Sequence, residues 1–269
     1  MNLWQDKRSR QLNTSAWPRR VIGVVGATGG LGASSLAAAL AVRASSNGLA
    51  SLLIDAHPHG GGVDVCLGLD TEPGLRWPDL ASVRGEIDAR AVLEDVPSVG
   101  ECRVLSWDRV PSRALADHGL AIAFALTQAA NLSVIDLPGA EADGAAIWWG
   151  LCDIVLVCGY GVRQMAAAAV VLELLEMVSR HAQARLLPGS SPQVMGKPRV
   201  HAVLRESAGK VDRDRAAATL GLPILGAMPR DAGVEAALTR GEPVGGRSGP
   251  TAKLSDELLG DILGWARAA

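Results

Sequence analysis

Four glycines fall within seven residues near the start of the chain, in the segment GATGGLGASS over 26–35. The segment follows a short β-branched run, 21–25, and precedes an Ala/Leu-rich stretch, 34–46, that favours a helix. A glycine-rich turn between a strand and a helix lets backbone N–H groups point at an anion, and the helix dipole adds to the attraction. The chemistry this segment could do is therefore phosphate binding, with Ser34 placed to bind Mg²⁺.

Two residues of this segment depart from the G-x-x-x-x-G-K-[ST] pattern of phosphate loops. Ala27 replaces the first glycine and Ala33 replaces the lysine. A charge-assisted hydrogen bond is worth about 1.5–3 kcal/mol, so we expect ATP binding to be weakened roughly ten- to hundredfold. Removing one donor that stabilises the transition state typically costs about 10²–10³ in rate. The sequence therefore predicts nucleotide binding with little or no hydrolysis.

Other side chains could also take part in chemistry. Asp136 ends an apolar run and, with Ser34, could hold Mg²⁺ through water; the alternative is a carboxylate that caps a turn. His57 and His59 could form a metal site with Asp64, but so short a segment favours a solvated loop. No Ser/His/Asp or Cys/His arrangement indicates nucleophilic catalysis.

The elements that must position these residues alternate along the chain. Apolar runs of strand length, continuous rather than alternating, are followed by stretches with helical spacing, which predicts a doubly wound, mostly parallel α/β sheet flanked by helices. We expect a flexible basic tail over 1–19, a single nucleotide-binding domain over 20–269 and a loop over 186–198. Strands are predicted over 21–25, 51–55, 103–106, 132–136, 153–158, 200–204 and 223–226, and helices over 34–46, 115–130, 165–180, 211–220, 231–240 and 253–267.

Composition narrows the function classes. With 48% hydrophobic and 20% charged residues the chain is globular, and a net charge of -2 gives no overall attraction to nucleic acid or anionic membranes. The N-terminus carries no signal peptide, and Asp153 interrupts the apolar stretch 145–162, which we interpret as a helix end and a buried strand rather than a membrane span. Four cysteines without CxxC spacing predict buried reduced thiols in the cytoplasm: Cys66, Cys102, Cys152 and Cys158.

Two apolar features allow more than one interpretation. Trp148 and Trp149 are adjacent, so either one of them lies at an interface or both pack at a corner between helix and sheet. The helix over 253–267 places Leu254, Leu258 and Ile262 on one side. It could target a membrane, but its acidic polar face favours docking on the domain.

Segment 26–35 resembles the deviant Walker loop of MinD/ParA proteins, KGGxGKT, and looks closest to the CpaE/TadZ branch and its septum-site-determining (Ssd-like) relatives. SLLIDAHPHGGGVDVCLGL (51–69) is similar to the switch segment of the family, and VIDLPG (134–139) to its second acidic motif. LGLPILGAMPRDAGVEAALTRGEP (220–243) resembles its closing strand, loop and helix. The resemblance covers roughly 20–245 and implies a P-loop NTPase-like fold.

The resemblance also identifies departures. The signature lysine, which in the family reaches the partner's phosphate, is Thr28, and the lysine in cis is Ala33. The D-x-D switch keeps Asp55 as a possible catalytic and metal-binding residue, but His57 replaces its second aspartate. Arg205 stands where the family has an asparagine that helps to hold adenine. The implied nucleotide-binding residues are Thr28, Gly29, Gly30, Leu31, Gly32, Ala33, Ser34, Ser35, Asp136, Arg205, Pro229 and Arg230, and the implied metal ligands are Ser34, Asp55 and Asp136.

Three function hypotheses follow. The first is a spatial organiser that binds ATP and Mg²⁺, dimerises through its nucleotide face, and serves as a scaffold for Tad-type pilus or secretion machinery or for septum placement, at a pole or septum. The second is a slow ParA-type partitioning ATPase that binds DNA, which requires a substitute cation such as Arg205, Arg230 or Arg163. The third, a ligase or reductase on the same fold, is disfavoured because no catalytic cluster is evident.

Overall fold

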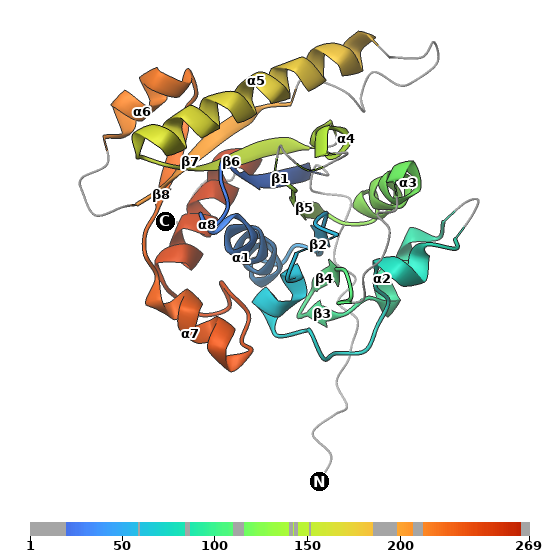
Figure 1. Cartoon of the computed structure of the whole chain (residues 1–269). Helices are drawn as coiled ribbons and strands as arrows, with labels where there is room; N and C mark the ends of the chain where they lie inside the picture. The colour runs from blue at the N-terminus through green and yellow to red at the C-terminus, as the bar shows by residue number, and fades with distance from the viewer. Residues whose placement is uncertain are drawn as a thin grey trace.

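The computed structural model describes residues 20–58, 60–83, 87–109, 116–139, 142, 145–150, 152–184, 198–206 and 212–264 (Figure 1). These residues form an eight-stranded sheet whose strands are β1 (Arg20–Gly26), β2 (Ser51–Asp55), β3 (Ser98–Val99), β4 (Cys102–Leu105), β5 (Leu132–Asp136), β6 (Asp153–Gly159), β7 (Val200–Arg205) and β8 (Ile224–Met228). Their spatial order is β3-β4-β2-β5-β1-β6-β7-β8, and every neighbouring pair is parallel except β3 with β4. The expectation of a doubly wound, mostly parallel sheet is confirmed.

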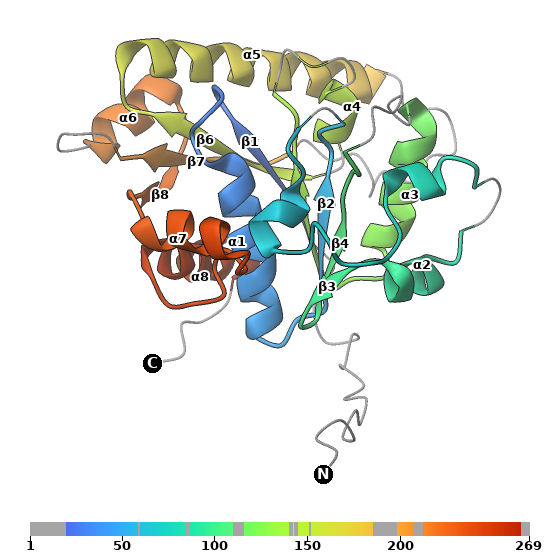
Figure 2. The ribbon, with the colours of Figure 1, turned by 60° about the horizontal axis from the view of Figure 1, so that its bottom comes forward.

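Helices cover both faces of this sheet (Figures 1 and 2). They are α1 (Ala33–Ser46), α2 (Ala89–Asp95), α3 (Ala116–Thr127), α4 (Ala145–Trp149), α5 (Val162–Ala184), α6 (Arg213–Leu220), α7 (Ala232–Arg240) and α8 (Pro250–Leu263), with the 3-10 turns η1 (Val63–Leu67) and η2 (Trp77–Leu80). One apolar cluster packs α1, α8 and η1 against one face of the sheet. The other packs the five helices α2, α3, α4, α5 and α6 against the opposite face. The strands carry apolar residues on both sides because both sides are covered.

Alternation along the strands divides their side chains between these two clusters. In β1, Ile22 and Val24 belong to the cluster under α1, whereas Val25 belongs to the opposite one. β2 and β5 are buried at every position. Because all strands except β3 run in the same direction, their carboxyl ends meet at one edge, where the loops that carry candidate functional residues begin.

The structure confirms most predicted elements and corrects their extents. α5 is longer than the predicted helix over 165–180, and α8 begins at Pro250 and ends at Leu263 rather than spanning 253–267. η1, η2, α2 and β3 were not predicted. The tail over 1–19 lies outside the described residues, as does almost all of the predicted loop over 186–198.

The two ambiguous apolar features are both packed. Trp149 is buried, and the ring of Trp148 lies edge-on to that of Trp77 with 6.1 Å between centroids, so the corner-packing interpretation holds. Leu254, Leu258 and other apolar residues of α8 are buried against α1 and β8, which confirms docking on the domain. Cys66 is half-buried and the other three cysteines are buried, and all four are free thiols. In the part of the chain that the structure describes, we find no helix with the length and apolar character needed to cross a bilayer.

Candidate functional site

The glycine-rich segment forms a loop between β1 and α1, as predicted. Its tip, Thr28 to Gly30, is exposed, whereas Leu31 is buried in the core below it. The N–H of Ala27 donates to the carbonyl of Val157 over 2.8 Å, which fixes the start of the loop to β6. Gly32 is the N-cap of α1 with φ of 89°, a left-handed conformation that strains any other residue. The loop is therefore anchored at both ends and open at its tip.

Small residues line the inner side of this loop. A Cβ on Gly26 would lie 2.9 Å from the carbonyl oxygen of Thr28, so only glycine fits there. The methyl group of Ala33 lies 3.7 Å from that same position, so residue 33 faces this interior with a small side chain. No side chain caps the first turn of α1, and no acidic residue lies in it. The amides at this helix N-terminus thus lack the partners that capping side chains supply elsewhere.

Two buried carboxylates stand beside the loop. Asp55 and Asp136 are register partners at the ends of β2 and β5, with exposed fractions of 1% and 3%. Asp55 accepts hydrogen bonds from the N–H groups of His57 and Val63, over 2.8 and 3.0 Å. In Asp136, Oδ1 is buried without a hydrogen-bond partner. Buried polar atoms are nearly always paired, so this oxygen is free to accept a ligand.

The environment of this pair disfavours negative charge. Burial raises the pKa of Asp55 to about 6 and, together with the negative charge of Asp55, raises that of Asp136 to about 7. The hydroxyl of Ser34 lies close enough to Asp136 to act in the opposite direction and favour ionisation. The structure thus brings together the three predicted metal ligands, Ser34, Asp55 and Asp136. Oxygen donors at the first turn of a helix suit Mg²⁺ bound to a phosphate.

His57 follows the end of β2 and is turned toward the end of β5. Its Nε2 lies 2.7 Å from the carbonyl oxygen of Leu137, so this nitrogen carries the proton and donates it. The metal site suggested for His57, His59 and Asp64 receives no support: His59 lies outside the described residues, and Asp64 is bound elsewhere. Nor do the described residues contain any group of three His, Cys, Asp or Glu side chains placed to hold a metal ion.

Asp64 is instead the centre of an arginine cluster. Its side chain is fully buried and receives two hydrogen bonds from the Arg109 guanidinium, at 2.9 and 2.8 Å. A nitrogen of Arg76 lies 3.7 Å away. Arg109 also donates to the carbonyl of Gly61, and a Cβ on Gly62 would overlap the Asp64 carboxylate. This cluster holds the glycine-rich stretch that follows Asp55.

A tryptophan fixes the backbone at the end of β2. The indole N–H of Trp77 donates to the carbonyl of Asp55 over 2.7 Å. The Trp77 ring is buried and lies 5.8 Å from that of Trp107. The position of the Asp55 backbone is therefore tied to an aromatic cluster on the α3 and α4 side of the sheet.

Two further residues reach the loop from the far side. Arg205, at the end of β7, places Nη1 3.7 Å from where a Cβ on Gly32 would lie, and the methyl of Met228 lies 3.1 Å from that point. Pro229 and Arg230 follow Met228 at the same edge of the sheet, Pro229 half-buried and Arg230 exposed. Among the described residues, no hydrogen bond or ion pair links the Arg230 side chain to the loop, whereas the guanidinium of Arg205 lies beside it.

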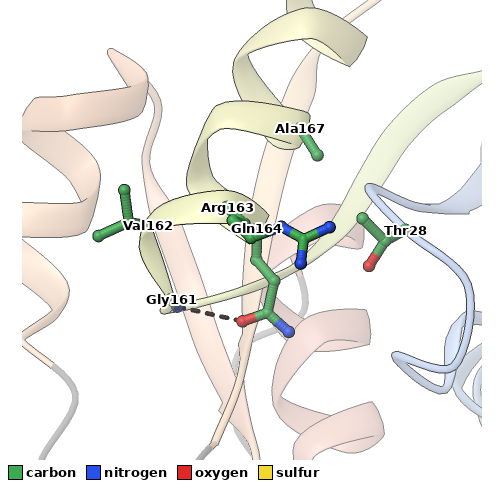
Figure 3. Close-up of a pocket in the computed structure, with 6 residues that line it drawn as sticks. All are labelled: Thr28, Gly161, Val162, Arg163, Gln164 and Ala167. Atoms are coloured by element: carbon green, nitrogen blue, oxygen red, sulfur yellow. Dashed lines mark hydrogen bonds between the residues drawn. The ribbon is translucent and has the colours of Figure 1, made fainter.

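A pocket of about 670 Å³ opens next to the loop tip (Figure 3). Its wall consists of Thr28 and residues at the start of α5, with Arg163 pointing toward Thr28 across the space. Gln164 accepts a hydrogen bond from the N–H of Gly161, and Val162 is 88% exposed. Volumes of this order hold small-molecule ligands. The complete lining is Thr28, Gly161, Val162, Arg163, Gln164 and Ala167.

Two known proteins resemble the chain in sequence. No protein-family model matches the chain. Two proteins of Mycobacterium tuberculosis, described as uncharacterized and from strains CDC 1551 and H37Rv, are each 31% identical over 229 residues. The match covers 78% of this chain and 64% of each relative, so the chain spans just under two thirds of the length of these relatives.

Solved structures resemble the chain over most of its length. MinD of Aquifex aeolicus matches with a TM-score of 0.70 at 17% identity, over 92% of this chain and 98% of that one. A ParA family ATPase from Chlorobium tepidum matches with 0.69 at 18%, over 90% and 99%. The septum site-determining protein MinD of Pyrococcus horikoshii, solved with Mg-ADP, matches with 0.67 at 18%, over 92% and 99%. The chain therefore has the fold of the MinD and ParA ATPases.

Proposed function

We propose that the chain is a MinD/ParA-like spatial organiser of the CpaE/TadZ kind, with Ssd-like relatives, that binds ATP and Mg²⁺ and hydrolyses ATP slowly or not at all. One observation supports this proposal: the glycine-rich loop between β1 and α1 lies beside a buried acid pair, but the loop has Thr28 and Ala33 where phosphate-binding loops of this family carry lysines. The sole lysine among the described residues is Lys253, which lies on α8.

The residues present fit a magnesium nucleotide. Backbone N–H groups of the loop and the N-terminus of α1 would hold the phosphates. Ser34 and Asp136, with Asp55 behind them, would hold Mg²⁺, which would neutralise phosphate charge when bound. The unpaired Oδ1 of Asp136 is the atom that most needs such a cation, since it has no other partner.

Hydrolysis is the function for which the site is least suited. In a phosphoryl transfer the protein contributes mainly positioning and positive charge. The Nε2–H of His57 is engaged with the Leu137 carbonyl, so that nitrogen is not available to accept a proton from water. A nucleotide that is bound but rarely cleaved would leave the protein in one state rather than cycling it.

Such a protein would act as a scaffold. The loop tip from Thr28 to Gly30 is exposed beside the open pocket at α5, so a second copy could approach the nucleotide on this face and form a homodimer. The fold neighbours include a protein described as septum site-determining. We extend that role to this chain: a cytoplasmic dimer, recruited to a pole or septum, whose partners are division proteins or Tad-type pilus or secretion proteins.

Nucleotide binding, turnover and assembly test this proposal together. We expect Mg-ATP to bind by calorimetry, to increase the mass measured by light scattering to that of a dimer, and to turn over far more slowly than in an active ATPase. Turnover of radiolabelled ATP at ordinary ATPase rates would contradict the degenerate site. Absence of binding with either ATP or ADP would contradict nucleotide recognition.

A substitution at residue 33 tests the loop itself. Because Ala33 faces the loop interior, Ala33→Lys should tighten Mg-ATP roughly ten- to hundredfold through one charge-assisted hydrogen bond. Ala33→Met, similar in length but uncharged, is the matched control and should give no gain. Equal affinities for the Lys variant and the unmodified chain would show that this loop does not present its interior to phosphate.

Localisation separates the scaffold from a partitioning ATPase. We expect a fluorescent fusion expressed in the source organism to form foci at a pole or septum and the Asp136→Asn variant to be diffuse. Even distribution over the nucleoid, with salt-dependent retention on DNA in vitro, would contradict the scaffold role.

A further inference from the structure

Arg205 places a positive charge at a position where the protein itself is already electropositive. Val203, two residues earlier on β7, belongs to the cluster under α1, so alternation directs Arg205 to the same face. Its Nη1 lies 3.7 Å from the Cβ position of Gly32, the N-cap of α1. Among the described residues, no carboxylate or carbonyl forms a hydrogen bond or ion pair with this guanidinium.

An unpaired guanidinium against a helix N-terminus is electrostatically unfavourable. A helix carries about half a positive charge at that end, and the first turn of α1 contains neither an acidic residue nor a capping side chain to offset it. Elsewhere in this chain, Arg109, Arg199 and Arg240 all form close ion pairs with carboxylates. Repulsion of this kind is relieved when an anion enters between the guanidinium and the amides.

A second feature of the same helix turn points to a ligand. Oδ1 of Asp136 is buried, has no partner, and belongs to a carboxylate close to Ser34 in the first turn of α1. A carboxylate needs a cation, whereas Arg205 and the amides need an anion. A polyphosphate with its bound metal ion satisfies both on the two sides of the loop.

The geometry points to Arg205 as the phosphate-binding cation of this site, in place of the lysine absent at Ala33; this rests on the nucleotide-binding function proposed above. The resemblance to MinD/ParA proteins placed Arg205 at the position of an asparagine that, in the family, helps to hold adenine. Its guanidinium instead lies beside Gly32, at the phosphate end of the loop. A planar guanidinium can donate two parallel hydrogen bonds to one phosphate, which an ammonium group does not do.

Two other arginines are less suited to this role. Arg163 points at Thr28 across the open pocket, at the exposed tip of the loop rather than at the helix N-terminus (Figure 3). Arg230 is exposed, and no recorded contact places it at the loop. The site consequently recognises polyphosphate through Arg205, so its affinity depends on the phosphates more than on the base.

Inorganic pyrophosphate distinguishes a phosphate contact from a base contact, because it has no base. We expect Arg205→Ala to weaken both Mg-ATP and Mg-pyrophosphate ten- to hundredfold in calorimetry, and Arg205→Lys to recover part of the loss for both. Arg199→Ala is the matched control: it removes the same charge just before the other end of β7, where Arg199 pairs with Asp153, and should leave both affinities unchanged. Circular dichroism melting checks that each variant folds.

The outcomes separate this inference from the proposed function. If the unmodified chain binds both probes and Arg205→Ala binds them equally well, the role of Arg205 is overturned while nucleotide binding stands. A loss confined to Mg-ATP, with pyrophosphate unchanged, would assign Arg205 to the base and overturn the inference in another way. An unmodified chain that binds neither probe overturns both proposals.

Discussion

Two groups of buried acids, Asp64 on the one hand and Asp55 with Asp136 on the other, differ in the cations that surround them. Asp64 is fully buried and receives two short hydrogen bonds from Arg109, with Arg76 close by. Asp55 and Asp136 are almost as deeply buried, but no arginine or lysine among the residues that the structure describes pairs with either. We call Asp64 with Arg76 and Arg109 the complete group, because the chain itself supplies its cations. Asp55 with Asp136 is the incomplete group, because it lacks a cation.

The difference indicates which acids are structural and which are functional. The hydrogen bonds to Asp64 raise the pKa of the Arg109 guanidinium, so the positive charge of this arginine is favoured. Burial raises the pKa of Asp55 to about 6, and burial together with the charge of Asp55 raises that of Asp136 to about 7, so charge on these two acids is disfavoured. A buried acid that is left without a cation is expected where a ligand supplies one.

The largest predicted effect comes from breaking the complete group. Asp64→Asn removes the negative charge between two guanidiniums, one of them nearly buried, and breaking a buried ion pair typically costs about 3–5 kcal/mol. We expect a loss of about 3 kcal/mol in the free energy of unfolding, measured by urea denaturation. Asp70→Asn, an exposed acid nearby, is the control and should change stability by less than about 0.5 kcal/mol. Equal effects would show that Asp64 is not the structural centre.

The sequence predicted the incomplete group better than the complete one. The phosphate loop, Ser34 and Asp136 each follow or precede an apolar run of clear length, so strand and helix patterns place them at one edge of a parallel sheet. Arg109 lies 45 residues from Asp64, beyond β4, and no periodicity relates them. Pairing of this kind depends on tertiary packing, which local patterns do not encode.

Short elements were missed for a similar reason, although one carried a usable signal. Asp88 accepts hydrogen bonds from the N–H groups of Arg90 and Ala91, as an N-cap does, and an aspartate before ARAVLED is a recognisable helix start. β3 has two residues and is held only by its antiparallel partner β4, so its propensity alone could not identify it. Contact of the Arg205 guanidinium with the loop also depends on tertiary structure, since β7 and β1 are separated by β6.

Removing the charge of Asp136 from the incomplete group should raise the free energy of unfolding rather than lower it. A folded-state pKa raised above the unfolded value means that ionisation costs stability as pH rises from about 4 to about 7. Asp136→Asn removes that cost, so we expect the ligand-free variant to be more stable than the unmodified chain by roughly 2 kcal/mol at pH 7.5. The difference should shrink as the pH falls and vanish only below about pH 4, where the acid is protonated in both the folded and the unfolded state. Melting temperatures from about pH 4 to 8 without Mg²⁺ measure it, and a variant less stable at pH 7.5 would show that Asp136 is already satisfied.

A divalent cation should act as the missing partner. At ten times its dissociation constant a ligand that binds only the folded state stabilises it by about 1.4 kcal/mol. We therefore expect magnesium chloride to raise the melting temperature of the unmodified chain at pH 7.5 and to have no such effect on Asp136→Asn. Sodium chloride of matched ionic strength is the control. A rise shared by both proteins would place the Mg²⁺ site elsewhere.

The smallest effect is expected from an ion pair that has good geometry but lies in solvent. Arg43 on α1 donates two hydrogen bonds of 2.9 Å to Asp256 on α8, as regular a pair as that of Arg109 with Asp64. Its side chains are 22% and 39% exposed, so water screens the charges and the free carboxylate is well solvated. Asp256→Asn should therefore change the free energy of unfolding by less than about 1 kcal/mol. Because distance is matched and burial is not, a loss as large as that of Asp64→Asn would mean that geometry, rather than burial, decides which acids this fold depends on.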